Sequence, residues 1–278
     1  MRLASPLPRT WDSPGGWVRA LREHGFRAAY WPLPDEAGEA EVDAYAEAAR
    51  AAGIVIAEIG AWHANPISPD EAIRASGVER CRAQLALADR VGARCCVNVA
   101  GSRGGEWDAP HPDNLSADTF ALIVDTVREI VDAVRPTRTY FTLEPMPWTL
   151  PDSPDSYLAL LRAIDRPRFA VHLDPVNFVN TPAKLYDNAA LLRECFAKLG
   201  PHIRSVHAKD IVLEPRLTVH LQEVRPGLGV LDHEVLLREI DRLDPDTPVL
   251  VEHLGSDADY AAAVAHIRGV ADALGLAV

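Results

Sequence analysis

Four short apolar segments of the chain each end on a side chain that can bind a proton or a metal ion. The segments are rich in β-branched and aromatic residues, which is typical of buried strands. The four residues are Glu144, Asp174, His207 and Glu252. An ionisable side chain at the end of a buried strand loses hydration and needs a partner there. We therefore expect the four side chains to share one site, at the carboxyl ends of four successive strands.

This donor set is rich in oxygen and has one nitrogen. Carboxylates suit hard divalent ions such as Mn and Mg, and a single imidazole is also compatible with Fe, Co or Zn. Neighbouring carboxylates repel one another and hold protons unless a cation compensates them. One bound divalent metal ion is the simplest interpretation, and an acid–base cluster without metal is the alternative.

The residues two positions earlier in each strand point to the same face. They are Thr142, His172, Ser205 and Leu250. Three of the four are polar, whereas a packed interior would favour Val, Ile or Leu. The pattern predicts a polar cavity beneath the four strand ends.

Strands and helices alternate along the whole chain. Strands are expected at 2–5, 27–31, 54–59, 94–99, 139–143, 169–173, 203–208 and 249–251. Helices are expected at 17–24, 43–52, 79–91, 154–164 and 183–199, and after Ser116, from Asp232 and after Ser256. Eight such units predict an α/β fold, a (β/α)8 TIM barrel with one domain over residues 1–278. The four ionisable residues support a barrel, because they fall at the carboxyl ends of strands, where the active sites of barrels lie. An open doubly wound sheet is the alternative.

Composition excludes several classes of protein. The 278 residues are 48% hydrophobic and 24% charged, which are globular values, and the net charge is −12 without a basic block. A nucleic-acid partner is therefore not expected. The chain has no apolar run long enough to cross a membrane, and its N-terminus lacks an apolar signal core. We expect a cytoplasmic protein whose four cysteines are buried thiols.

Five motifs together carry a family resemblance: LEP at Glu144, HLDPVN at Asp174, VHAKD at His207, RPGLGVLD after a long loop, and VEHL at Glu252. They resemble the sugar phosphate isomerase/epimerase family of the xylose isomerase-like TIM-barrel superfamily, which includes ketose 3-epimerases, inosose dehydratases and endonuclease IV. The resemblance implies one divalent metal, most often Mn, bound by Glu144, Asp174, His207 and Glu252. It also implies that Glu144 and Glu252 are catalytic and exchange protons with the substrate.

The chain departs from the ketose epimerases at two positions. Trp148 stands where they carry a second glutamate, and Asn177 stands where they carry a histidine. The identity of the substrate cannot be transferred for this reason. The loss of that histidine, together with the acidic net charge, also disfavours DNA repair.

Six residues near the strand ends are candidates for substrate binding: Lys209, Asn177, His63, Trp148, Glu223 and Arg225. Lys209 shares the strand face of His207 and is suited to a substrate oxygen, or alternatively to a salt bridge with Asp210 or Glu144. His63 lies in a loop, where a solvated histidine is the alternative. The segment 211–231 reads as a long loop, and we expect a mobile lid there.

Together with the residues, the resemblance implies a metal-dependent isomerase or epimerase that acts on a ketose, keto-sugar or related polyol through an enediolate. A lyase or dehydratase that begins with the same proton abstraction is the alternative, and a non-catalytic sugar-binding protein is a third. The expected partner is a small-molecule sugar or sugar derivative. Whether the chain forms a homodimer is left open by the sequence.

Overall fold

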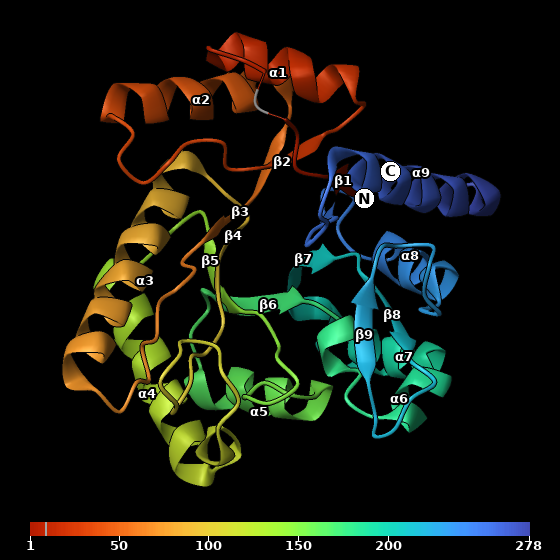
Figure 1. Ribbon diagram of the computed structural model, residues 1–278. Helices are drawn as coiled ribbons and strands as arrows, with labels where there is room; N and C mark the ends of the chain where they lie inside the picture. Colours follow the sequence, from red (N-terminus) through yellow and green to blue (C-terminus); the bar gives the residue numbers. More distant parts are fainter. Residues whose placement is uncertain (9) are drawn as a thin grey trace. The chain divides into compact units, whose positions relative to one another are not determined.

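The computed structural model describes residues 1–8 and 10–278. The strands are β1 Arg2–Ala4, β2 Ala28–Tyr30, β3 Val55–Gly60, β4 Cys95–Asn98, β5 Tyr140–Leu143, β6 Phe169–Leu173, β7 Ile203–His207, β8 Asp210–Leu213, β9 Leu221–Val224 and β10 Pro248–Leu250. The helices are α1 Pro14–Glu23, α2 Glu39–Ala52, α3 Glu71–Val91, α4 Ala117–Val134, α5 Pro154–Ile164, α6 Pro182–Tyr186, α7 Asn188–Leu199, α8 His233–Asp241 and α9 Asp257–Leu274. Short 3-10 turns are η1 Pro112–Leu115, η2 Val176–Phe178 and η3 Gly200–His202. The alternation of strands and helices is therefore confirmed (Figure 1).

The chain consists of two compact units. The first unit comprises Met1–Ala57, Val179–Ala197 and Ser205–Val278, and the second comprises Glu58–Phe178 and Lys198–Arg204. The expectation of a single domain over residues 1–278 stays a prediction.

The second unit is built around parallel strands in the order β3, β4, β5 and β6. Glu58 pairs with Cys95, Cys95 with Tyr140, and Phe141 with Phe169. Helices α4 and α5, which follow β4 and β5, each begin at a side-chain cap. Ser116 accepts the backbone N–H of Thr119, and Ser153 forms a reciprocal capping box with Ser156. These caps define where the chain turns back after β4 and β5.

The first unit pairs β1 with β10 and β10 with β7, all parallel. Its core includes a cluster of fully buried residues from several strands, namely Ala4, Ala28, Ala57 and Leu250. Strands β8 and β9 lie side by side as an antiparallel pair, apart from the parallel strands (Figure 1). Small side chains in this cluster allow the strands to pack closely.

Three sequence expectations need correction. The segment 211–231 is not an irregular loop, because most of β8 and all of β9 fall within it and form a hairpin. The helix expected at 183–199 is interrupted at Asp187 and gives α6 and α7. Helix α3 begins at Glu71 rather than at 79, because the carboxylate of Asp70 accepts the first backbone N–H groups, those of Ala72 and Ile73.

Other expectations about burial are confirmed. Thr142, His172, Ser205 and Leu250 are all fully buried. The four cysteines are buried and form no disulfide bond. Among the helices in the described part of the chain, none combines the length and the apolar character needed to cross a bilayer.

Candidate active site

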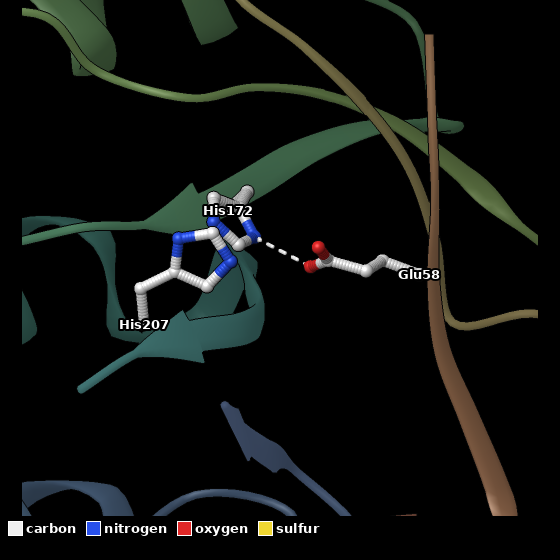
Figure 2. Close-up of side chains that lie close together, drawn as sticks. All are labelled: Glu58, His172 and His207. Atoms are coloured by element: carbon white, nitrogen blue, oxygen red, sulfur yellow. Dashed lines mark ion pairs between the residues drawn. The ribbon is translucent and has the colours of Figure 1, made fainter. Parts of the chain in front are cut away.

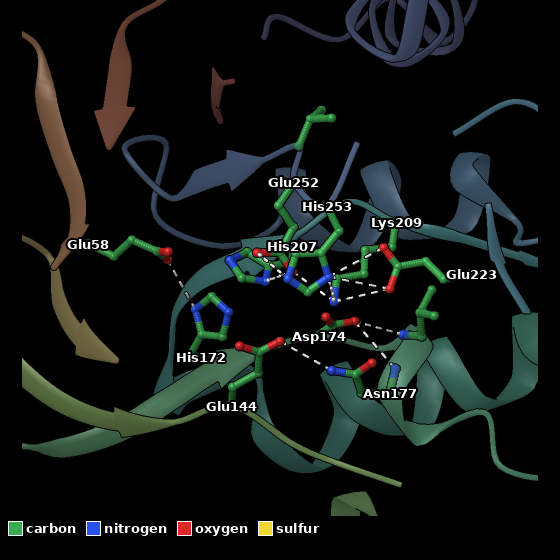
Figure 3. Close-up of polar contacts among 12 residues, drawn as sticks. Glu58, Glu144, His172, Asp174, Asn177, His207, Lys209, Glu223, Glu252 and His253 are labelled. Atoms are coloured by element: carbon green, nitrogen blue, oxygen red, sulfur yellow. Dashed lines mark hydrogen bonds and ion pairs between the residues drawn. The ribbon is translucent and has the colours of Figure 1, made fainter. Parts of the chain in front are cut away.

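In the first unit, the end of β7 and the segment after β10 bring three ionisable side chains together. The Nδ1 atom of His207 lies 2.7 Å from Oε1 of Glu252, and Nζ of Lys209 lies 2.7 Å from the same oxygen (Figure 3). His207 and Lys209 are almost fully buried, and the side chain of Glu252 is 11% exposed. Two nitrogen groups therefore hold the Glu252 carboxylate in one orientation.

Lys209 also connects Glu252 to the β8–β9 hairpin. Its Nζ atom lies 3.5 Å from Glu223 on β9 and 3.2 Å from Nδ1 of His253. His253 adopts a left-handed backbone conformation with φ 56°, which is unusual for a residue with a side chain. A hydrogen bond to Glu223, 3.5 Å long, is the main cause that raises the pKa of His253 above its ordinary value. The cluster thus alternates cationic and anionic groups.

In the second unit, a single turn of chain after β6 orients two carboxylates. Asp174 follows β6, and its Oδ1 atom accepts the backbone N–H groups of Val176 at 3.1 Å and Asn177 at 3.3 Å. The side-chain amide of Asn177 donates to Oε1 of Glu144 at 3.1 Å (Figure 3). Asp174 and Glu144 are both buried. Pro175 and Asn177 in the sequence DPVN therefore build the turn that positions Asp174 and contacts Glu144.

A buried acid–imidazole pair lies in the same unit. Oε2 of Glu58 on β3 is 3.6 Å from Nδ1 of His172 on β6 (Figure 2). His172 is fully buried and Glu58 is 3% exposed. Sequence reasoning placed His172 in the interior but missed Glu58. The signal was a lone acid in the middle of the apolar segment VIAEIG, which an amphipathic surface strand would also produce.

Two candidates for substrate binding contact the loop after β4. His63 is exposed, has φ 66°, and its ring centroid lies 5.2 Å from that of Trp107. The indole N–H of Trp148 donates to the backbone oxygen of Asp108 at 2.7 Å. Both side chains therefore rest against adjacent residues of one loop. Their role toward a substrate stays a prediction.

Arg225 and Asp210, also in the first unit, contact other groups of that unit. The Nε atom of Arg225 lies 3.5 Å from a carboxylate oxygen of Asp259 on α9. Lys209 has Glu252 and Glu223 as ion-pair partners in this unit. Asp210, which the sequence offered as a partner for Lys209, directs its carboxylate to backbone N–H groups of the hairpin and of the PGLG turn. That role was not visible in the sequence.

The chemistry of the four strand-end residues fits a hard divalent cation. Three carboxylates and one imidazole are ligands of the kind that Mn and Mg accept. Asn177 and Lys209 provide the outer contacts that orient metal-binding carboxylates in proteins. The residue types present are therefore suited to a metal ion, and the expectation that Glu144, Asp174, His207 and Glu252 would hold it stays a prediction.

Comparisons with known proteins place the chain in a family. A curated relative, L-ribulose-5-phosphate 3-epimerase UlaE of Salmonella typhimurium, is 28% identical over 196 residues, which are 70% of this chain and 62% of the relative. The match thus spans less than two thirds of that relative's length.

Solved structures with the same fold have different chemistries. Endonuclease IV from Thermus thermophilus matches with a TM-score of 0.73 and 15% identity, over 98% of this chain and all of the other. D-psicose 3-epimerase from Clostridium cellulolyticum, solved with D-tagatose, matches with a TM-score of 0.69 and 13% identity, over 97% and 99% of the two chains. These similarities establish the fold only, and the reaction has to be inferred from the residues of the site.

The family model for xylose isomerase-like TIM barrels matches residues 18–270. This range covers nearly all of the predicted strand–helix units, so the expected (β/α)8 architecture is confirmed and the open doubly wound sheet is excluded. The chain belongs to the xylose isomerase-like TIM barrel family.

Proposed function

We propose that the protein is a divalent-metal-dependent sugar isomerase or epimerase that acts on a ketose, a keto-sugar or a related polyol. Glu144, Asp174, His207 and Glu252 are the ligands of one metal ion, with Mn as the first choice. The observation that carries the proposal is the Glu252 carboxylate, which lies just after strand β10 and contacts His207 and Lys209, in a chain of the xylose isomerase-like TIM barrel family. The name of the curated epimerase relative supports the substrate class.

The metal, when bound, supplies Lewis acidity toward a carbonyl oxygen and so makes the neighbouring carbon-bound proton more acidic. One of the two glutamates, Glu252 or Glu144, removes that proton as a general base, and the other, in its protonated form, returns a proton as a general acid. The ammonium of Lys209, 2.7 Å from Glu252, keeps this carboxylate oriented and can donate to a substrate oxygen. Asn177 holds Glu144 through its amide at 3.1 Å.

The remaining candidates for substrate binding have supporting roles in this proposal. Glu223 and Arg225 lie on and just after β9, and Glu223 reaches the Lys209 cluster, so the hairpin contributes to substrate binding. His63 and Trp148, which rest against the loop after β4, would contact the more distant part of a sugar in this proposal. Trp148 offers an aromatic face of the kind that sugars stack on.

Solvent exchange tests the proposal directly. The metal-loaded protein is incubated in D2O with a panel of ketoses, keto-acids of sugars, inososes and 3-keto-glycosides, and the products are followed by NMR. Epimerisation places deuterium on one carbon and yields a second sugar, whereas isomerisation moves the carbonyl group. A lyase gives an unsaturated or shortened product instead, which would assign the alternative reaction to the same site.

The variant Glu252→Gln tests whether Glu252 is the general base. It keeps the size of the side chain but cannot accept a proton, so we expect exchange to fall by about 10²–10⁴-fold. Exchange at the rate of the unchanged protein would remove Glu252 from the mechanism. No exchange with any member of the panel would refute proton abstraction.

A further inference from the structure

We infer that the substrate is an uncharged sugar rather than a sugar phosphate. This inference rests on the proposed function and specifies its substrate class. In TIM barrels a phosphate group is commonly held by the loops after the seventh and eighth strands and by a helix N-terminus nearby. In this chain those strands are β7 and β10, and the loops after them carry their own negative charges.

The glycine-rich turn after β9 is filled by a carboxylate of the protein itself. Successive backbone N–H groups in such turns form a concave cradle that binds anions. Here Oδ2 of Asp210 accepts the N–H groups of Gly227 and Gly229, each at 2.9 Å. Its Oδ1 atom accepts those of Ile211 and Leu231, also at 2.9 Å. Asp210 is 1% exposed, so this buried carboxylate occupies the place that a phosphate would take in the turn.

The two helix N-termini that follow are acidic as well. Helix α8 is capped by Asp232, whose side chain accepts the N–H of Val235 at 2.9 Å, and Glu234 lies in the first turn. Helix α9 has Asp257 and Asp259 in its first turn. Acidic residues at these positions already compensate the positive end of the helix dipole and would repel a second anion.

The nearby cations are paired with acids of the same unit. Arg225 contacts Asp259 at 3.5 Å, and Lys209 contacts Glu252 at 2.7 Å and Glu223 at 3.5 Å. To bind a phosphate, either cation would have to exchange a carboxylate partner for the ligand. Such alternating donors and acceptors suit hydroxyl groups, which both donate and accept hydrogen bonds. The curated relative is named for a sugar phosphate, L-ribulose 5-phosphate, whereas this site is suited to an uncharged sugar.

The test compares sugars with their own phosphate esters in the solvent-exchange assay. A ketopentose is paired with its 5-phosphate and a ketohexose with its 6-phosphate. We expect kcat/KM for the uncharged member to exceed that for its ester by about tenfold or more, because acidic side chains surround the binding region. An equal or higher kcat/KM for the ester overturns the inference.

A binding measurement separates this inference from the proposed function. If no sugar or ester exchanges its proton, the proposed function fails, and a titration of the protein with inorganic phosphate, carried out with diamagnetic Mg in place of Mn and followed by ³¹P NMR, still decides the question of charge. No saturable binding at millimolar phosphate supports the inference, and saturable binding at lower concentrations overturns it.

Two matched variants test whether the Arg225–Asp259 ion pair causes the preference for the uncharged sugar. Asp259→Asn removes the acid that pairs with Arg225, so we expect the preference for the uncharged sugar to shrink several-fold. Asp257→Asn removes the same charge from the same helix turn but keeps the Arg225–Asp259 ion pair. A preference that is unchanged in Asp259→Asn, or that shrinks equally in both variants, would refute the part assigned to Arg225 and Asp259.

Discussion

Replacement of Asp210 by asparagine should strongly destabilise the protein. The native carboxylate accepts four backbone N–H groups, two on each oxygen, and is almost fully buried. Asparagine keeps one acceptor oxygen and places an NH2 group against the other two donors. Two hydrogen bonds to a charged group are lost, each worth about 1.5–3 kcal/mol, so we expect the free energy of unfolding to fall by about 3–6 kcal/mol.

Urea unfolding and hydrogen exchange measure this effect. The loss of stability should be accompanied by faster exchange of the amides of Gly227, Gly229 and Leu231, which bond to Asp210 in the native protein. Asp232→Asn is the matched control, since asparagine caps a helix as well as aspartate does, and it should change stability by less than about 0.5 kcal/mol. A loss below about 1 kcal/mol in Asp210→Asn, with unchanged exchange at the three amides, would refute the anchoring role of this carboxylate.

Three further predictions follow from the same structure. Asn177→Ala removes the 3.1 Å hydrogen bond to Glu144 and should weaken metal binding by about 10–100-fold in a calorimetric titration, and an unchanged affinity would contradict the orienting role. Burial alone would raise the pKa of Asp89, but hydrogen bonds from the N–H groups of 137–139 and from the Thr137 hydroxyl lower the pKa overall. The ionised Asp89 carboxylate therefore stabilises the fold fully above the unfolded pKa of about 3.9, and this stabilisation is lost as pH falls through the lower folded pKa. Asp89→Ala should cost about 1 kcal/mol at neutral pH, allowing for its partial exposure, and little at pH 2 in urea titrations, whereas an equal cost at both pH values would exclude the charge as the cause. In the 211–231 segment, amides near the hairpin tip, where Leu217 is 97% exposed, should exchange fast and those bonded to Asp210 slowly; uniform slow exchange that ligand does not alter would exclude a lid.

Local signals in the sequence were sufficient to predict the elements that carry the site. Ser116, Ser153 and Ser256 cap the helices that they were expected to cap, because a side-chain oxygen at these positions satisfies backbone N–H groups regardless of the rest of the fold. The polar residues at the ends of apolar segments were likewise visible, because burial on both faces makes parallel strands nearly uniform in hydrophobicity.

Features that depend on contacts between distant segments were not predictable. The β8–β9 hairpin reads as a loop because its strands are only four residues long, and their pairing is not marked by a short glycine turn. The partnership of Glu58 with His172 joins two strands far apart in the sequence. The left-handed conformation of His253 has no signal in the residue type, and Asp210 shows its role only once the PGLG turn folds back onto it.

The central claim is that Glu144, Asp174, His207 and Glu252 together bind one divalent metal ion. Metal analysis of the purified protein and of the four single alanine variants tests it most directly, with Asp89→Ala as a remote carboxylate control. We expect one ion per chain in the unchanged protein and in the control, and strongly reduced metal content in each of the four variants. Full occupancy in two or more of the four variants would contradict it.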